Sequence, residues 1–510
     1  MATQKVIARR EFIKSTAAGV TAAAISGPEM FAAPAKKPNI LLIMSDEHNP
    51  FVTGAYGNRI VHTPNIDGLA ADGITFENHY CNSPLCSPSR MSFTAGKYVS
   101  RVSAWNNRCD LPNNDIASLP RVMTAAGYDS VLCGKMHYDR TRRYGWTEAG
   151  GNFNKAFKDG LSAGRWNPEK TFSPVLSPRF EQFHPGENSG ILNHDRKVTK
   201  GAVEFLSQRK DDDKPFFLLV GYLAPHFPLI VPEEWDKYKG KIAMPEIPKG
   251  FLDQLPTNYK TLRAGFEMCT VPSETVKRGR ELYYGLTSWF DNEMGKVLST
   301  LRANKEMAEN TIIIYTSDHG ENMGEHGMWW KNTMYEQSAH VPTIISWPKK
   351  WKGNQRRKLA SSHVDLVRTI IDMGGGKAPT DWNGSSMVPW MNDPSYAWKD
   401  FALSEYYAHN VASGYVMVRT GPWKYTYHNR MTAKHGPERE LYDLATDPKE
   451  LNNLAAKPEH AKRIAAMHAM MLRELRGKDP EQTELQCRKE LSIGYRRTDK
   501  LPTDHVSLNE

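Results

Sequence analysis

No apolar run in the 510-residue sequence approaches the roughly 18 residues that a membrane-spanning helix needs, so we expect no membrane span. Cysteine is scarce, with six residues in the whole chain. They are Cys81, Cys86, Cys109, Cys133, Cys269 and Cys487. They include neither a CxxC pair nor the spacing of a zinc site, which excludes a zinc module and a scaffold built from disulfides.

The chain also lacks a strong excess of one charge. Lysine and arginine number 66 against 57 acidic residues, a formal net charge of +9. Such an excess suits an anionic substrate, but it is equally common on surfaces with no such role. We expect no nucleic-acid partner. Apolar residues at 40% and charged residues at 24% are typical of a globular protein, and the length predicts two domains.

The first 35 residues have the pattern of a bacterial export signal. The segment Arg9-Arg10-Glu11-Phe12-Ile13-Lys14 precedes a mildly apolar stretch over residues 15–25, and Ala33-Pro34-Ala35 offers a cleavage site. Paired arginines before such a stretch are typical of a twin-arginine signal peptide. We therefore expect residues 1–35 to be removed and the mature protein to be periplasmic or extracellular.

Short apolar runs alternate with helical patterns over the next 340 residues. The runs cover 39–45, 128–133, 216–223 and 311–316, and the helical stretches cover 64–72, 118–126, 200–209 and 278–304. This alternation predicts an α/β fold with a large, mostly parallel β-sheet flanked by helices. We assign residues 36–375 to this domain, which is expected to be catalytic.

The character of the sequence changes near residue 375. Residues 374–394 are rich in Gly, Pro, Asn and Ser, which predicts a linker or an irregular segment. Strand-like segments follow at 415–419, 423–427 and 440–442, and then a helical segment at 458–476. We therefore expect residues 376–510 to form a smaller α+β domain with antiparallel strands and a helix.

Polar side chains follow each of the four buried runs. Asp46 and Glu47 follow the first, Lys135 and His137 the second, His226 the third, and Asp318-His319 the fourth. Ligands of open parallel sheets bind outside the carboxyl ends of the strands. These residues are therefore the candidates for one functional site.

The segment Cys86-Ser87-Pro88-Ser89-Arg90 adds a candidate nucleophile. Proline after a small polar residue predicts that a helix begins at Pro88, which would place Cys86 beside unpaired backbone N–H groups. Arg90 lies one turn further and could face the same point. On the residues alone, Cys86 is expected to be a thiolate of low pKa, and hence a nucleophile or a redox residue.

A wider set of residues resembles the type I sulfatases, the formylglycine-dependent family of the alkaline phosphatase superfamily. The C-x-P-x-R motif matches the signature in which the cysteine is oxidised to formylglycine. Gly127-Tyr128-Asp129-Ser130 and Gly134-Lys135-Met136-His137 are similar to the second signature. The likeness continues through Asp46, His226, Asp318-His319-Gly320, Lys331, Glu440–Leu444 and Asp447-Pro448, nearly the whole mature chain.

This resemblance implies a sulfuric ester hydrolase that a formylglycine-generating enzyme matures at Cys86. It implies a divalent metal held by Asp46, Asp318 and residue 86. The sequence departs from the family at Glu47, where many members have aspartate, and at His319, where many have asparagine. Either Glu47 or His319 could therefore complete the metal site. Carboxylate ligands favour Ca²⁺, with Mn²⁺ as the alternative if an imidazole is a ligand.

The resemblance also implies a role for each remaining residue. Arg90, Lys135 and Lys331 would spread positive charge over the sulfate oxygens. His226 or Lys331 would protonate the leaving oxygen, and His137 would remove a proton from the hydrated formylglycine so that sulfate is expelled.

The substrate is less well defined. We expect a sulfated carbohydrate, because export and positive charge fit extracellular glycans; choline sulfate and phosphonate or phosphate esters are alternatives. The residues that follow His137 could line the sugar pocket: Arg140, Arg142, Arg143, Tyr144 and Trp146. Two alternative functions remain: a non-catalytic binder of sulfated glycans and a thiol-redox protein. The sequence leaves the oligomeric state open.

Overall fold

The computed structural model describes residues 36–139, 141–154, 176–210, 213–409, 411–431 and 435–491. The predicted export segment, residues 1–35, lies outside the described residues. The residues from Lys37 onward belong to one compact unit. The domain boundary placed near residue 375 therefore stays a sequence-based prediction.

An eight-stranded sheet forms the centre of the molecule, in the order β10-β2-β9-β8-β1-β6-β3-β4. Its strands are β1 (Asn39–Asp46), β2 (Gly73–Tyr80), β3 (Asp129–Gly134), β4 (Thr147–Glu148), β6 (Phe216–Pro225), β8 (Thr311–Ser317), β9 (Thr343–Ser346) and β10 (Gln355–Ser362). Only β9 runs antiparallel to its neighbours, β2 and β8. The predicted mostly parallel α/β sheet is confirmed.

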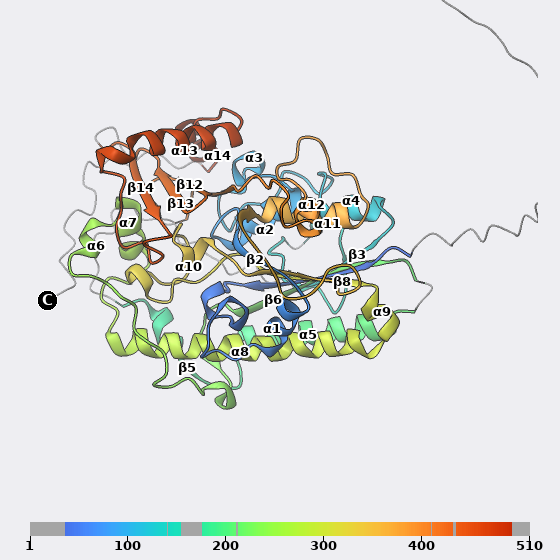
Figure 1. Cartoon of the computed structure of the whole chain (residues 1–510). Helices are drawn as coiled ribbons and strands as arrows, with labels where there is room; N and C mark the ends of the chain where they lie inside the picture. The colour runs from blue at the N-terminus through green and yellow to red at the C-terminus, as the bar shows by residue number, and fades with distance from the viewer. Residues whose placement is uncertain are drawn as a thin grey trace, which may run out of the picture. The chain divides into compact units, whose positions relative to one another are not determined.

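Alternate residues of the central strand β1 enter two different cores, because successive side chains of a strand face opposite sides of a sheet. Leu41 and Ile43 belong to the core that contains residues of α5 (Gly190–Gln208) and α8 (Ser273–Ala303). Ile40 and Leu42 belong to the core that contains residues of α2 (Cys86–Ala95), α4 (Leu119–Ala125) and α11 (His363–Met373). Helices thus cover both faces of the sheet (Figure 1), and β1 is buried on both.

The remaining elements are short connections around this sheet. They are α1 (Pro64–Ala71), α3 (Val99–Val102), α6 (Phe251–Gln254), α7 (Thr257–Gly265), α9 (Lys305–Glu309), α10 (Glu336–Ala339), the paired strands β5 (His184–Pro185) and β7 (Ile230–Val231), and the 3₁₀ turns η1 (Pro50–Val52), η2 (Gly54–Tyr56), η3 (Pro178–Gln182), η4 (Glu233–Trp235), η5 (Glu325–Gly327) and η6 (Pro458–His460).

The C-terminal region contains a second sheet, antiparallel throughout, in the order β11-β12-β13-β14. Its strands are β11 (Ala402–Tyr406), β12 (Tyr415–Thr420), β13 (Trp423–His428) and β14 (Glu438–Asp443), followed by α13 (Ala461–Glu474) and α14 (Pro480–Glu490). The antiparallel strands and the helix that the sequence predicts here are confirmed.

The segment predicted to be a linker is only partly irregular. It contains α12 (Val388–Asn392), and Trp382, Met387 and Trp390 are buried in the same core as α11. The large apolar side chains among the Gly and Pro residues were a sign that the segment is buried. Their spacing matches neither a helix nor a strand, so it predicted no element. A linker was therefore the wrong description of this part of the chain.

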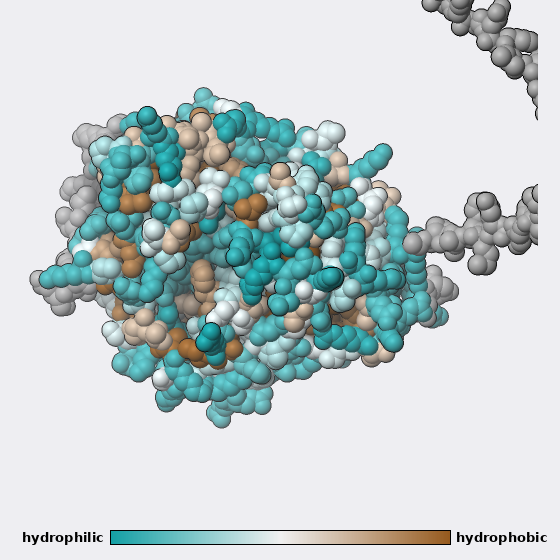
Figure 2. Space-filling view, viewed as in Figure 1, coloured by the Kyte–Doolittle hydropathy of each residue, from teal (hydrophilic) through white to brown (hydrophobic). Residues whose placement is uncertain are grey.

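The face of the molecule in Figure 2 is mainly hydrophilic, with small, separate hydrophobic patches. Among the described residues, no helix is both long enough and apolar enough to cross a membrane.

A substitution in β1 should measure how much the fold depends on its doubly buried strand. Leu42→Ala removes a fully buried side chain and should lower the free energy of unfolding by about 2–5 kcal/mol. Leu485→Ala, at a position 49% exposed on α14, should change it by less than about 0.5 kcal/mol. Urea unfolding followed by circular dichroism compares the two, and equal losses would contradict this account of the core.

Candidate active site

Four neighbouring strands, β8, β1, β6 and β3, bring the predicted site residues to one edge of the sheet. The register pairs Ser45 with Ser317 and Asp46 with Pro225. Asp318 and His226 therefore follow directly on either side of Asp46. Asp195 of α5 fixes the chain before His226, because its carboxylate accepts 2.8 Å hydrogen bonds from the backbone N–H groups of Leu223 and Ala224.

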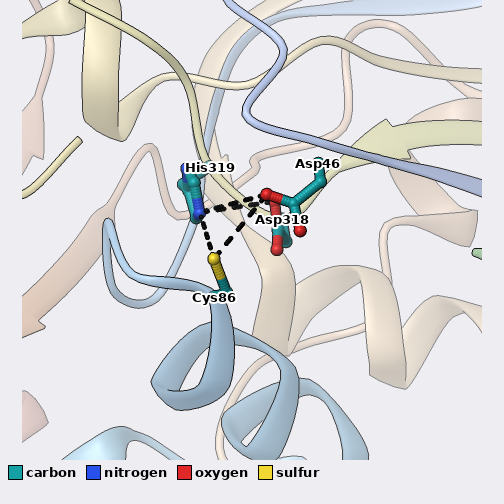
Figure 3. A group of neighbouring side chains, drawn as sticks. All are labelled: Asp46, Cys86, Asp318 and His319. Carbon is teal, nitrogen blue, oxygen red and sulfur yellow. Dashed lines mark hydrogen bonds and ion pairs between the residues drawn. The ribbon is translucent and has the colours of Figure 1, made fainter. Parts of the chain in front are cut away.

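Asp46, Cys86, Asp318 and His319 converge at this edge, each offering one ligand atom within 4.8 Å of the others. Cys86 Sγ lies 3.1 Å from His319 Nε2 and 3.6 Å from Asp46 Oδ1. His319 Nε2 lies 3.7 Å from Asp46 Oδ1 and 3.6 Å from Asp318 Oδ1. Figure 3 shows Cys86 at the start of its helix, pointing at the other three side chains.

Arg90 holds the two carboxylates in this arrangement. Its Nε donates to Asp318 Oδ2 at 2.7 Å and its Nη2 to Asp46 Oδ2 at 3.2 Å. Its Nη1 donates to the backbone oxygen of Lys135 at 2.7 Å, and the whole side chain is buried. The guanidinium is thus bound to the two aspartates and to the backbone, and the positive charge that it is expected to place on the sulfate oxygens stays a sequence-based prediction.

This pattern leaves Oδ1 of both aspartates directed at the cluster. Two hard carboxylate oxygens and one imidazole form a donor set that suits a divalent cation. The residues present therefore fit the metal that the sequence implies.

Glu47 and His319, the two alternatives for the last metal ligand, lie in different surroundings. His319 Nε2 is in the cluster with Cys86. Glu47 Oε2 instead accepts from Lys331 Nζ at 2.9 Å and lies 3.1 Å from His226 Nε2. Burial raises the pKa of Glu47, and the Lys331 ammonium opposes that rise. His319 therefore lies beside residue 86. Glu47 pairs with Lys331 and also offers a ligand atom within 4.8 Å of those of Asp46 and His226, so both residues stay candidates for the metal site.

Helix α2 begins at Cys86 itself, two residues before the predicted start at Pro88. The expectation of a low-pKa thiolate is also wrong. Burial, together with the nearby carboxylate of Asp46, raises the pKa of Cys86 to about 12. Burial and the Asp46 carboxylate therefore disfavour a free thiolate at Cys86.

Lys135, His226 and Lys331 complete the charged lining. Lys135 Nζ forms an ion pair with Asp46 Oδ2, and Asp46 has a pKa well below its usual value because Lys135, His226 and Arg90 outweigh the effect of burial. Lys331 Nζ lies 2.7 Å from His226 Nε2, and His226 Nδ1 lies 2.5 Å from the oxygen of Phe227. Burial, and then Lys331, hold the pKa of His226 well below its usual value.

His137 is buried two residues beyond Lys135, in a left-handed backbone conformation with φ of 60°. Gly134 and Gly221 make this path possible. A Cβ on Gly221 would lie 2.2 Å from the backbone oxygen of Lys135, and one on Gly134 would lie 2.1 Å from the oxygen of Gly221. Only glycine lets these backbones approach closely enough to turn Lys135 and His137 into the interior.

Four of the residues proposed to line the sugar pocket have structural roles instead, and the fifth, Arg140, lies outside the described residues. Tyr144 and Trp146 are buried in the hydrophobic core, Arg142 Nε pairs with Asp139 at 3.2 Å, and Arg143 Nε pairs with Glu148 at 2.7 Å. That hypothesis is wrong, because a mixture of basic and aromatic residues does not distinguish a pocket from a structural turn.

The sequence analysis did not predict a role for two residues near the site, Glu321 and Arg179. Glu321 is buried and accepts hydrogen bonds from the backbone N–H groups of Met323 at 2.8 Å and Trp330 at 2.6 Å, which fixes the loop before Lys331. Arg179 in η3 lies over the aromatic rings beside His226 and Lys331. Neither belongs to a motif, so no sequence signal marked them.

Comparison with known proteins agrees with this site. Residues 38–376 match the Sulfatase family model, and residues 324–478 match the model named N-sulphoglucosamine sulphohydrolase, C-terminal. A choline-sulfatase of Rhizobium meliloti (strain 1021) is 30% identical over 453 residues, 83% of each chain. An N-acetylglucosamine-6-O-sulfatase of Bacteroides thetaiotaomicron is 26% identical over 535 residues, 88% of each chain.

Solved structures share the fold. One, in complex with its substrate D-glucosamine-2-N,6-O-disulfate, has a TM-score of 0.69 at 22% identity, covering 88% of this chain and 100% of the other. The phosphonate monoester hydrolase of Agrobacterium radiobacter has a TM-score of 0.70 at 22% identity, covering 86% and 96%.

The site contains buried carboxylates and a histidine at the carboxyl edge of a mostly parallel sheet, with lysines around them. This arrangement is typical of one class of protein, the hydrolases of anionic esters. Within that class the chain belongs to the sulfatase family. It is a sulfuric ester hydrolase of the alkaline phosphatase superfamily.

Separate substitutions should show which residue completes the metal site. His319→Ala should reduce the metal content of the purified protein to less than about a tenth, since it removes one of few ligands. Glu47→Gln should retain metal, because its partner is Lys331. Elemental analysis by mass spectrometry measures both, with His468→Ala on α13 as the control. Normal metal in the first variant and loss in the second would make Glu47 the ligand.

Proposed function

We propose that this sulfatase releases sulfate from a sulfated carbohydrate after Cys86 has been oxidised to formylglycine. The observation that carries the proposal is the position of Cys86 Sγ, at the start of α2 and in contact with His319 and Asp46. A formylglycine at this position would lie against the proposed metal ligands. The N-acetylglucosamine-6-O-sulfatase relative supports a sugar substrate.

We propose Ca²⁺ as the metal, held by Asp46, Asp318, His319 and residue 86, with Mn²⁺ as the alternative because one ligand is an imidazole. The bound metal would supply Lewis acidity at a sulfate oxygen, and hydrated formylglycine would supply the attacking hydroxyl. Arg90 pairs with both aspartates and orients their carboxylates. Lys135, beside Asp46, adds positive charge where the sulfate oxygens bind.

The pair Lys331–His226 is suited to protonate the leaving oxygen. Lys331 carries three N–H donors, of which Glu47 and His226 accept two, so the third can reach the substrate. Burial by itself disfavours the ammonium, but the nearby Glu47 and Asp46 carboxylates favour it. His137, buried beside Lys135, is proposed as the base that takes the proton of residue 86 when sulfate is released.

We propose, finally, that residues 1–35 direct twin-arginine export to the periplasm or beyond. Arg9-Arg10 followed by Phe12 and Lys14 supports this, and export of a folded protein is compatible with maturation of Cys86 before transport. The maturation partner would be a formylglycine-generating enzyme.

Mass spectrometry of the active-site peptide tests the proposed modification. In protein coexpressed with a formylglycine-generating enzyme, residue 86 should be about 18 Da lighter than cysteine, the change from thiol to aldehyde. Cys86→Ala should abolish turnover of sulfated saccharides and of 4-nitrophenyl sulfate while the protein stays folded. Fully active protein that contains only cysteine at this position would refute the formylglycine proposal. Choline sulfate and a phenyl phosphonate ester, assayed beside these substrates, test the two alternative activities.

Replacing His226 tests the Lys331–His226 pair, because His226 Nε2 accepts from Lys331 and holds the ammonium that is proposed to donate the proton. His226→Ala should lower the rate on a sugar sulfate by about 10²–10⁴-fold, because an alkoxide is a poor leaving group without a proton. The loss on 4-nitrophenyl sulfate, whose phenolate leaves unaided, should be much smaller. Steady-state rates on both substrates give the comparison, with His468→Ala as the control. Equal losses on the two substrates would mean that His226 does not assist the leaving group.

A further inference from the structure

Arg179 stands in an aromatic cage beside the proposed active site. Its Cζ lies 4.8 Å from the ring centroid of Phe227, 4.9 Å from that of Trp330 and 5.4 Å from that of Phe266. The side chain is half-buried. Three rings thus fix the position of one guanidinium by cation–π contact while part of it remains accessible.

The cage is directly connected to the catalytic residues. Phe227 follows His226, and the two rings stack with centroids 4.4 Å apart. Lys331 Nζ also lies over the Phe227 ring, 5.1 Å from its centroid. Because Arg179 and Lys331 share this ring, their charges are no more than about 10 Å apart. One sugar residue can span that distance.

Within the described part of the chain, Arg179 differs from the other arginines near the site in having no carboxylate partner. Arg90 is bound to two aspartates and Arg143 to Glu148. Among the residues that the structure describes, no hydrogen bond or ion pair involves Arg179. A guanidinium offers five N–H donors and stays charged even though burial lowers the pKa of Arg179. These donors are available to an anion.

Two buried polar atoms in the same ring cluster also lack partners among the described residues. They are Nε1 of Trp330 and Nδ1 of His409. The His409 ring lies 5.8 Å from that of Phe266, and the Phe266 ring lies 5.6 Å from that of Trp330. Buried polar atoms are rarely left without a hydrogen bond, so this cluster has the character of a binding site for a polar group.

A further cation, Arg108, lies near this cluster. Burial lowers the pKa of His409 to about 3, and the positive charges of Arg179, Lys331 and Arg108 add to that effect. The loop that carries Arg108 contacts the start of α2, where the Asn107 side chain accepts from the backbone N–H of Ser87 at 3.0 Å. Arg108 is exposed.

We propose that Arg179, assisted by Arg108, binds a second anionic group of the substrate, a carboxylate or a further sulfate. The preferred substrate class is then a saccharide with at least two anionic groups, one of which is the sulfate ester that is cleaved. This inference rests on the proposed function. Choline sulfate is a poorer fit to this site. The Arg179 guanidinium already occupies the rings that a quaternary ammonium would need, and the two positive charges would repel each other.

The test compares sulfate esters with and without a second anionic group. The panel contains a glucosamine monosulfate, the matching disulfate, a sulfated uronic acid and 4-nitrophenyl sulfate. Compounds that are not cleaved are assayed as competitive inhibitors of 4-nitrophenyl sulfate hydrolysis. Wild-type enzyme should prefer a dianionic saccharide, and the better of the two dianions identifies the second group as sulfate or carboxylate.

Arg179→Gln should lower kcat/KM, or raise the inhibition constant, for the dianionic saccharide by about 10- to 100-fold, the effect of one charge-assisted hydrogen-bonding group. The loss on monosulfated compounds should be several-fold smaller. Arg463→Gln is the matched control, because Arg463 Cζ lies 3.5 Å from the centroid of the Trp423 ring on the C-terminal sheet. It should leave both classes unchanged.

The outcomes separate this inference from the proposed function. Equal losses of Arg179→Gln on mono- and dianionic compounds, or a wild-type preference for the monosulfate or for choline sulfate, would overturn the second anion site while sulfate ester cleavage stands. Failure of the wild-type enzyme to cleave any carbohydrate sulfate while it cleaves another ester would overturn the proposed carbohydrate function.

Discussion

The buried ion pairs of Arg90 with Asp46 and Asp318 are the interaction on which the site depends. The two aspartates end neighbouring parallel strands, so their carboxylates are forced together and would repel each other without a cation between them. Removing one member of such a buried group costs about 3–5 kcal/mol because a charge is left unpaired. The same arginine belongs to α2, which begins at Cys86. Arg90 therefore links the placement of residue 86 to that of the metal ligands.

Charge balance extends outward from this centre. Lys135 pairs with Asp46 and Lys331 with Glu47, so each buried carboxylate of the site has a cation in contact with it. This balance holds before a metal or a sulfate ester enters. A divalent cation would add positive charge at the Oδ1 atoms that Arg90 leaves free, and a sulfate ester would bring the compensating negative charge. The departure of Glu47 from the usual family pattern is explained in the same way, since the longer side chain reaches Lys331.

The sequence predicted the central strands and the residues at their ends, because buried parallel strands are continuous apolar runs and their carboxyl ends share one edge. It did not predict β2 or β10. These strands lie at the margin of the sheet and include the polar residues Glu77, Asn78 and Arg356, so they are not continuous apolar runs. The sequence also did not predict the raised pKa of Cys86. The position at a helix start favours a thiolate, but burial and the Asp46 carboxylate outweigh the helix dipole, and only the three-dimensional structure gives that burial.

Substrate selection depends on residues far apart in the sequence. Arg179 comes from η3, Phe227 from the segment after β6, Phe266 from the end of α7 and Trp330 from the loop before Lys331. Three aromatic rings around a cation are the means by which proteins bind quaternary ammonium ligands. Here the rings already hold a guanidinium of the chain itself, which converts a cage suited to a cation into a fixed positive charge. The chain thus belongs to the sulfatase family, while the proposed second anion site depends on this one arginine, which no motif of the sequence marks.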